Sequence, residues 1–222
     1  MRTKPSEITL NFIQDIIKRE GRVADFLGHK IIINKKVFPV DSPFSYSSKI
    51  TAKRLRPKKD DVVLDIGTGT GVQAIIAAKR GAKRVVAVDI DKNSLENARQ
   101  NVKFHKLVKV IEIRKSDLFS NIGPDEKFDI IVSQLPFANV DYKHKISHFL
   151  FDPGFKLHTR LMKDAKKHLT NKGKLFIPSS QIADEKRLLK LIKKYDYKIL
   201  KIEKERYAGI IWKLYVLGLN SN

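Results

Sequence analysis

The segment that most restricts how this chain can fold runs from Val62 to Gly71, where an apolar stretch leads into a glycine-rich turn. β-Branched and apolar residues reach Asp65, and three glycines then follow at every second position. The apolar residues after this turn have the i, i+3, i+4 spacing of an amphipathic helix: Val72, Ile75 and Ile76. A strand, a tight glycine turn and a helix start therefore predict an α/β fold that binds a polar ligand at the carboxyl end of the strand.

The spacing of the glycines distinguishes between kinds of ligand. The dinucleotide-binding fingerprint G-x-G-x-x-G needs a third glycine where this chain has Val72, which counts against a nicotinamide or flavin cofactor. The pattern D-x-G-x-G-x-G instead resembles motif I of the class I S-adenosylmethionine-dependent methyltransferases. The zwitterionic methionine end of that cofactor needs backbone N–H groups, a nearby carboxylate and the close approach that glycine allows. The resemblance implies that these residues contact the cofactor: Asp65, Gly67, Thr68, Gly69 and Gly71.

Two later acidic residues match the same family by their order. Asp89 ends a second apolar stretch 18 residues beyond Gly71, close to the spacing for a carboxylate that binds ribose hydroxyls. The alternative is that Asp89 caps the next helix, a role that Asp91 can fill. After a third apolar stretch, the resemblance places Asp117 at the adenine amino group. It also implies that Ile90 and Leu118 line the cofactor site, with Phe119 as an alternative to Leu118. The alternative explanation for Asp117 is that it is simply part of a polar turn, where aspartate is common.

A fourth apolar stretch ends in Gln134-Leu135-Pro136-Phe137. Many amino-group methyltransferases carry Asn/Asp-Pro-Pro-Tyr/Phe here, where a side-chain oxygen and a backbone carbonyl accept the protons of the target nitrogen and the aromatic ring stacks on the substrate. Gln134 keeps the amide but adds a methylene, which can move an acceptor by about 1 Å and lower the rate about 10²-fold if nothing compensates. The resemblance therefore implies a catalytic segment here, in a divergent or an impaired form.

Composition limits the chemistry that the protein can perform. The chain has no cysteine, which excludes disulfide bonds, thiolate zinc sites and cysteine nucleophiles. His144 and His148 have i, i+4 spacing, but no third ligand is evident and we expect no metal site. No apolar run approaches the roughly 20 residues that span a bilayer, and no signal-peptide pattern opens the chain. We therefore expect a cytoplasmic protein without membrane contact.

The charge is strongly unbalanced, with 45 Lys and Arg residues against 24 Asp and Glu residues and a formal net charge of +21. Such a field attracts polyanions. A lysine-rich thermophilic proteome is the alternative, but such proteomes usually enrich glutamate as well. We therefore expect a nucleic-acid partner. Basic residues concentrate at 49–59 and 186–206, and each segment is either a binding surface or a solvated face.

The chain is expected to divide at residue 48. Residues 1–48 read as an extension beside the cofactor site, with a helix that Ser6 caps and Gly21 ends, and a hairpin that pairs 29–33 with 37–40. Residues 49–222 read as the methyltransferase domain, including a helix that continues to Leu169, a turn at 171–173 and a strand at 174–178. The alternation of strands and helices predicts a Rossmann-like, doubly wound and mainly parallel α/β sheet.

The resemblance implies seven strands in the order 3-2-1-4-5-7-6, with the last strand antiparallel, and S-adenosyl-L-methionine as the cofactor. For the substrate we favour RNA, at a base nitrogen. The alternative is a protein, because the release-factor glutamine methyltransferases share the small-domain architecture and the motif after the fourth strand. The non-enzymatic alternative is a domain that binds the cofactor but has an impaired active site. The oligomeric state stays open.

Overall fold

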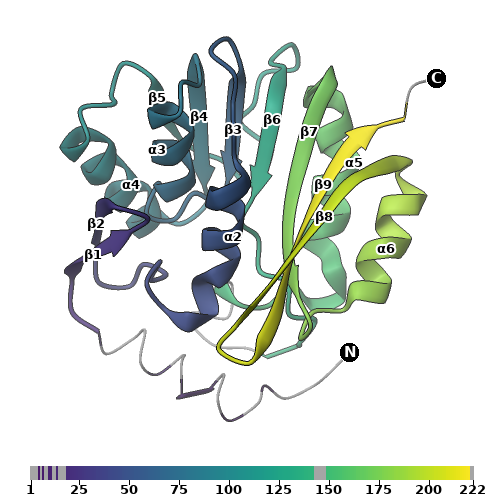
Figure 1. The fold of residues 1–222 in the computed structure, drawn as a ribbon, viewed down its shortest axis with the longest axis horizontal. Coiled ribbons are helices and arrows are strands. Elements are labelled where there is room, and N and C mark those ends of the chain that lie inside the picture. Colours follow the sequence, from purple (N-terminus) through teal and green to yellow (C-terminus); the bar gives the residue numbers. More distant parts are fainter. Residues whose placement is uncertain are drawn as a thin grey trace.

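Seven strands form one sheet in the order β5-β4-β3-β6-β7-β9-β8 (Figure 1). The computed structural model describes residues 5, 7, 10, 11, 14, 19–142 and 149–220. All neighbours pair in parallel except β9, which is antiparallel to β7 and β8. The doubly wound sheet and its strand order are therefore confirmed. The strands are β3 (Val62–Ile66), β4 (Arg84–Asp89), β5 (Ile111–Lys115), β6 (Phe128–Ser133), β7 (Leu169–Ser180), β8 (Tyr197–Tyr207) and β9 (Ile210–Leu219).

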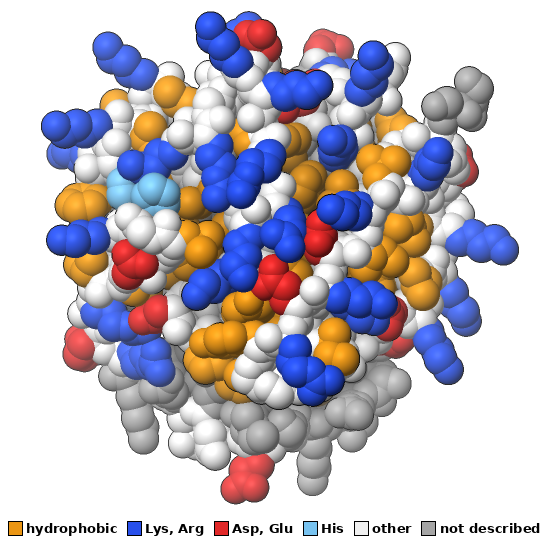
Figure 2. Space-filling model, in the orientation of Figure 1, with side chains coloured by type: hydrophobic (Ala, Val, Ile, Leu, Met, Phe, Trp, Pro, Cys, Tyr) orange, Lys and Arg blue, Asp and Glu red, His pale blue; other side chains and the backbone are white. Residues whose placement is uncertain are grey.

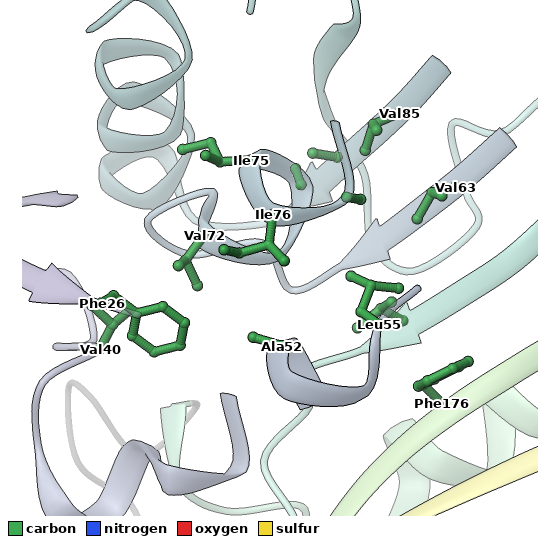
Figure 3. Close-up of a cluster of buried hydrophobic side chains, with 14 of the residues drawn as sticks. Phe26, Val40, Ala52, Leu55, Val63, Val72, Ile75, Ile76, Val85 and Phe176 are labelled. Carbon is green, nitrogen blue, oxygen red and sulfur yellow. The ribbon is translucent and has the colours of Figure 1, made fainter. Parts of the chain in front are cut away.

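Helices cover both faces of the sheet, because the central strands are apolar on both sides. The helices are α2 (Tyr46–Arg54), α3 (Val72–Lys79), α4 (Lys92–Phe104), α5 (Lys156–His168) and α6 (Glu185–Lys194), with short 3₁₀ turns η1 (Pro43–Ser45) and η3 (Pro153–Phe155). α2, α3 and α4 contribute to one buried cluster, and α5 and α6 contribute to another on the opposite face. Figure 3 shows part of the first cluster, in which side chains of α2 and α3 lie near strand residues such as Val63 and Val85.

The small hairpin pairs different strands from those expected. β1 (Arg22–Phe26) pairs with β2 (His29–Ile33), and the segment 37–40 forms no strand. Leu27 and Gly28 connect β1 and β2, and both have positive φ, as a two-residue type I′ turn requires. The segment 37–40 contains Pro39, which has no N–H to give to a strand ladder, and its two valines are buried instead.

The boundary between α5 and β7 also differs from the expected one. The helix ends at His168 and β7 begins at once, so residues 171–173 lie inside the strand rather than in a turn. A Cβ atom at Gly173 would lie 3.0 Å or less from the carbonyl oxygens of Thr170 and Phe128. This glycine therefore permits a close approach of the chain where the β6–β7 register shifts, rather than ending a helix.

Several expectations fall where the structure gives little or no description. Most of the helix expected after Ser6 lies outside the described residues, and so do His144 and His148. Residue 48 lies inside α2, and the division of the chain there stays a prediction. Within the described ranges, no helix is long and apolar enough to cross a membrane.

Candidate functional site

A cavity of about 470 Å³ lies at the carboxyl ends of β3, β4, β5 and β6. From β3 the chain continues to β4 and β5 on one side of β3, and then returns to β6 on the other side. The cavity therefore lies where the strand order reverses. Open α/β sheets bind ligands at this switch point, and the volume suits a ligand of cofactor size. The four segments predicted to bind cofactor and substrate therefore converge on one cavity.

The glycine turn closes one wall of the cavity. The backbone N–H groups of Gly67 and Thr68 both donate to the carbonyl oxygen of Val88, at 2.9 and 3.0 Å, which ties the turn to β4. Gly67 has a φ of +72°, and a Cβ atom there would lie 3.1 Å from the carbonyl oxygen of Gln134. Glycine is therefore needed for the β3 turn to lie against the segment that follows β6.

Asp65 shapes this turn from behind. Its side chain is fully buried, and Oδ2 accepts hydrogen bonds from Thr68 Oγ1 at 2.6 Å and from the Ala74 backbone N–H at 3.2 Å. Asp65 is not among the residues that line the cavity, although we predicted a cofactor contact for it. Burial raises the pKa of the Asp65 carboxyl from 3.8 to about 7, against the opposing effect of the two hydrogen bonds.

This raised pKa predicts a pH-dependent stability in the cofactor-free protein. Folded Asp65 keeps its proton up to about pH 7, whereas the unfolded chain loses it near pH 4, so the folded state binds more protons between these values. Raising the pH from 5 to 8 should therefore lower the unfolding free energy of the natural protein. In the Asp65→Asn variant, which lacks this carboxyl group, the decrease should be smaller by about 2 to 3 kcal/mol. Urea unfolding of both proteins at the two pH values measures this effect. If the difference in unfolding free energy between the two proteins were the same at both pH values, the raised pKa of Asp65 would be contradicted.

Asp89 presents a carboxylate to the cavity. Its Oδ2 accepts from the Gly69 backbone N–H and its Oδ1 from the Asp91 backbone N–H, both at 3.0 Å. Burial raises the pKa of Asp89, and these N–H donors oppose the rise. Asp91 caps α4, because its Oδ2 accepts from the Ser94 N–H at 2.8 Å. The capping role is therefore filled by Asp91, while Asp89 and the neighbouring Ile90 line the cavity.

The residues after β5 form the adjoining wall. Asp117 lines the cavity, and its Oδ2 accepts from Arg160 Nη2 at 2.9 Å. Leu118 also lines the cavity and has a φ of +54°. Phe119 instead stacks on the ring of His168, with the ring centroids 5.0 Å apart, and does not line the cavity. Of the two apolar residues considered for the adenine, Leu118 is thus the one that lines the cavity.

The segment after β6 lines the opposite side. Gln134, Leu135, Pro136 and Phe137 all face the cavity, and the Gln134 N–H donates to the Ile66 carbonyl oxygen at 2.9 Å. Gln134 Oε1 accepts from Ser48 Oγ at 3.1 Å. The Gln134 Nε2 atom is buried and has no hydrogen-bond partner among the described residues. Gln134 therefore lines the cavity with one donor atom that the described residues leave unpaired.

Sequence reasoning missed several polar residues of the cavity wall, among them Ser48, Thr70, Gln73 and Arg160. Gln73 Nε2 donates to the Ser48 carbonyl oxygen at 2.8 Å, while Gln73 Oε1 and Thr70 Oγ1 are buried without a hydrogen-bond partner among the described residues. A polar residue on the buried, apolar face of the helix at 72–79 was an available signal for Gln73. Ser48 carried no such signal, because its position depends on how α2 packs.

The donor set fits S-adenosylmethionine. A carboxylate at Asp89 suits ribose hydroxyls, and the apolar side chains of Ile90 and Leu118 suit the faces of a purine. The orphaned acceptors Thr70 Oγ1 and Gln73 Oε1 suit an ammonium group near the glycine turn. The residues present could therefore hold each part of that cofactor.

Comparison with known proteins indicates the family of this chain. The family model described as methyltransferase small domain matches residues 29–206. A putative protein N5-glutamine methyltransferase from Methanocaldococcus jannaschii is 31% identical over 173 residues, covering 75% of this chain and 86% of that protein. A ribosomal protein L11 methyltransferase from Ruminiclostridium cellulolyticum is 37% identical over 114 residues, which cover 50% of this chain and only 36% of that protein. The chain thus spans about a third of the length of that relative.

Solved structures share the fold at low sequence identity. The ribosomal protein L11 methylase from Lactobacillus delbrueckii subsp. bulgaricus matches with a TM-score of 0.63 and 22% identity, over 83% of this chain and 82% of that one. A tRNA methyltransferase from M. jannaschii matches with a TM-score of 0.66 and 20% identity, over 92% and 58% respectively. From the extent of the family match and the coverage of the M. jannaschii glutamine methyltransferase, this chain belongs to the methyltransferase small domain family.

Proposed function

We propose that this protein is an S-adenosylmethionine-dependent methyltransferase that modifies a planar nitrogen, with RNA as its substrate. The observation that carries the proposal is the single cavity shared by the glycine turn, Asp89 and the Gln134–Phe137 segment. The groups that we assign to the cofactor and those that we assign to the substrate line the same cavity, and a direct transfer requires such proximity. When bound, the cofactor supplies an activated methyl group on a sulfonium.

The residues of the chain would bind and orient the two reactants. The Asp89 carboxylate would accept hydrogen bonds from the ribose hydroxyls, and Thr70 and Gln73 would accept from the ammonium end of the cofactor. The Gln134–Phe137 segment would hold the substrate nitrogen opposite the methyl group that the bound cofactor would supply. The nitrogen–methyl bond would form as the sulfur–methyl bond breaks, leaving a neutral thioether, and the proton of the nitrogen would pass to solvent. Most of the rate would come from this positioning.

The Gln134 amide suggests which substrate edge is recognised. Its Oε1 is engaged by Ser48, and its Nε2 is the buried atom without a partner. It would therefore donate to a carbonyl oxygen beside the target nitrogen, a role that differs from the proton acceptor implied by the resemblance. Nucleobases such as guanine present an N–H next to a carbonyl, and Phe137 would contact the planar ring.

A second candidate is methylation of a protein glutamine. It is favoured by the likeness to the putative N5-glutamine methyltransferase of M. jannaschii. A glutamine side chain also presents a carbonyl oxygen next to a nitrogen, so Gln134 suits both substrates. The net charge of +21 favours RNA.

Radiolabelled S-adenosylmethionine distinguishes these activities. The purified protein is incubated with a cell extract that has been divided into RNA and protein fractions. We expect label on RNA that ribonuclease removes. Label on a protein band would support the glutamine activity instead, and cofactor binding without any label would support an impaired site.

A further inference from the structure

The exposed residues of α5 form a basic stripe. Four residues of this helix are exposed, and all four are basic: Lys156, Arg160, Lys163 and Lys167. Their spacing of i, i+4, i+7 and i+11 places them along one side of the helix, over about 16 Å at 1.5 Å per residue. One strand of a nucleic-acid duplex carries a phosphate about every 3.4 Å of its axis, so the stripe spans several phosphates.

The neighbouring helix α6 continues this basic surface. It buries Leu188, Leu191 and Ile192 against the sheet and exposes Leu189 together with five basic residues: Lys186, Arg187, Lys190, Lys193 and Lys194. Neither helix exposes an acidic residue, because Asp164 and Glu185 are both partly buried. The two helices pack on the same face of the sheet (Figure 1). We call these nine exposed basic residues the α5–α6 surface.

In the other basic segment, around α2, two of the basic residues are paired with acids of β8. Lys53 pairs with Glu205 at 2.6 Å, and Arg54 pairs with Glu203 at 3.2 Å. Figure 2 shows the face that carries α2, where Asp and Glu side chains are interspersed among the Lys and Arg side chains. The α5–α6 surface also has ion pairs, because Arg160 pairs with Asp117 and Lys167 pairs with Asp164. Every charged residue that α6 exposes is basic and forms no ion pair with another described residue, so the net positive charge is concentrated there.

The α5–α6 surface adjoins the cavity. Leu157 and Arg160, in the first turns of α5, line the cavity, and so does Ile182, just before α6. Both helices follow segments that leave the carboxyl ends of strands, so both run away from the cavity rim. A strand bound along either helix would therefore pass the cavity mouth at its end.

We propose that the α5–α6 surface binds the phosphate backbone of an RNA substrate and brings its target base to the cavity. The proposal rests on the RNA methyltransferase function and adds where the substrate is held. The surface binds phosphates without reading sequence, while the cavity selects the base. Single-stranded or looped RNA suits this arrangement, because its bases can leave the stack.

A triple variant tests the surface: Lys156→Ala, Lys163→Ala and Lys190→Ala. None of these residues lines the cavity, and alanine retains helix propensity. The matched control is Lys58→Ala, Lys59→Ala and Lys83→Ala, which removes the same charge from exposed positions near the amino ends of β3 and β4. Fluorescence anisotropy with labelled bulk tRNA, from 50 to 200 mM KCl, gives the affinity and its salt dependence for each protein.

We expect the α5–α6 variant to bind the tRNA about tenfold or more weakly at 50 mM KCl, and the slope of log K against log[salt] to fall by about 2 to 3. The control should stay close to the natural protein. Equal losses in both variants, or an unchanged slope, would overturn the proposal. Displacement of the tRNA by poly-L-glutamate as readily as by unlabelled tRNA would indicate an acidic protein partner and would also overturn it.

The same preparations separate this proposal from the proposed function. Calorimetry with S-adenosylhomocysteine should show that both triple variants bind the cofactor product as the natural protein does. If the natural protein bound no cofactor product, the methyltransferase function would fail, whatever the tRNA result. If cofactor binding were intact and the tRNA affinity of the α5–α6 variant unchanged, the proposed surface alone would fail.

Discussion

Replacing Asp89 by alanine will weaken S-adenosylmethionine binding by about 30- to 140-fold. A carboxylate that accepts two ribose hydroxyls makes charge-assisted hydrogen bonds, and their loss costs about 2 to 3 kcal/mol. At 1.4 kcal/mol per factor of ten, that cost gives the expected change in the dissociation constant. Isothermal titration calorimetry measures it directly.

Asp91→Ala is the matched control, because it also removes a carboxylate at the start of α4. Asp91 caps that helix and does not line the cavity, so its loss should cost about 1 kcal/mol of stability and little cofactor affinity. Asp89→Asn adds a second comparison, since an amide oxygen can still accept from the Gly69 N–H. Equal weakening by the Asp89 and Asp91 variants would show that both act only through the loop.

Replacing Gln134 by alanine will lower the turnover number by about 10²-fold and leave the cofactor dissociation constant unchanged. Truncation removes the side chain that would orient the substrate nitrogen, and misplacement by about 1 Å costs a rate of this order. Steady-state and single-turnover methylation of the RNA identified by radiolabelling would measure the effect. An equal rate for the variant would show that Gln134 is structural.

Ser48→Ala separates positioning from chemistry. Ser48 holds Gln134 Oε1, so its truncation should lower the turnover number about tenfold through the same amide. The double variant should then be no slower than Gln134→Ala alone, because the serine has nothing left to orient. If the rate losses of the two single variants multiplied in the double variant, this coupling between Ser48 and Gln134 would be contradicted.

Much of the fold could be predicted from the sequence, because its pattern is local. The apolar strand segments 62–66 and 84–89 and the glycine turn between β3 and α3 are dictated by residue type and spacing, and the structure has them as predicted. The hairpin was predicted wrongly, because the turn at Leu27-Gly28 uses a leucine with positive φ, a choice that leaves no clear signal. The boundary at Leu169 was missed because Gly173 serves packing between strands there.

The candidate site follows the same division. Asp89, Asp117 and Gln134 could be placed around one cavity, because each lies at or just after the carboxyl end of a parallel strand, at the same edge of the sheet. Their roles in binding and catalysis stay predictions. Ser48 and Arg160 reach the cavity only through the packing of α2 and α5, which no short-range pattern encodes. Asp65, predicted at the ligand, supports the turn from behind because Thr68 and Ala74 occupy one of its oxygens.

The ties between α2 and β8 set an order in time for making the site. Lys53 is held by Glu205, and the Tyr46 hydroxyl donates to the same carboxylate at 2.5 Å, across a sequence separation of 159 residues. At roughly 5 to 20 residues per second, the ribosome adds Glu205 about 8 to 32 s after Tyr46. Ser48 lies on this helix, so the tie that fixes this part of the cavity wall beside Gln134 can form only after Glu205 has been added. A nascent chain therefore contains the whole glycine turn well before it can make the tie between α2 and β8.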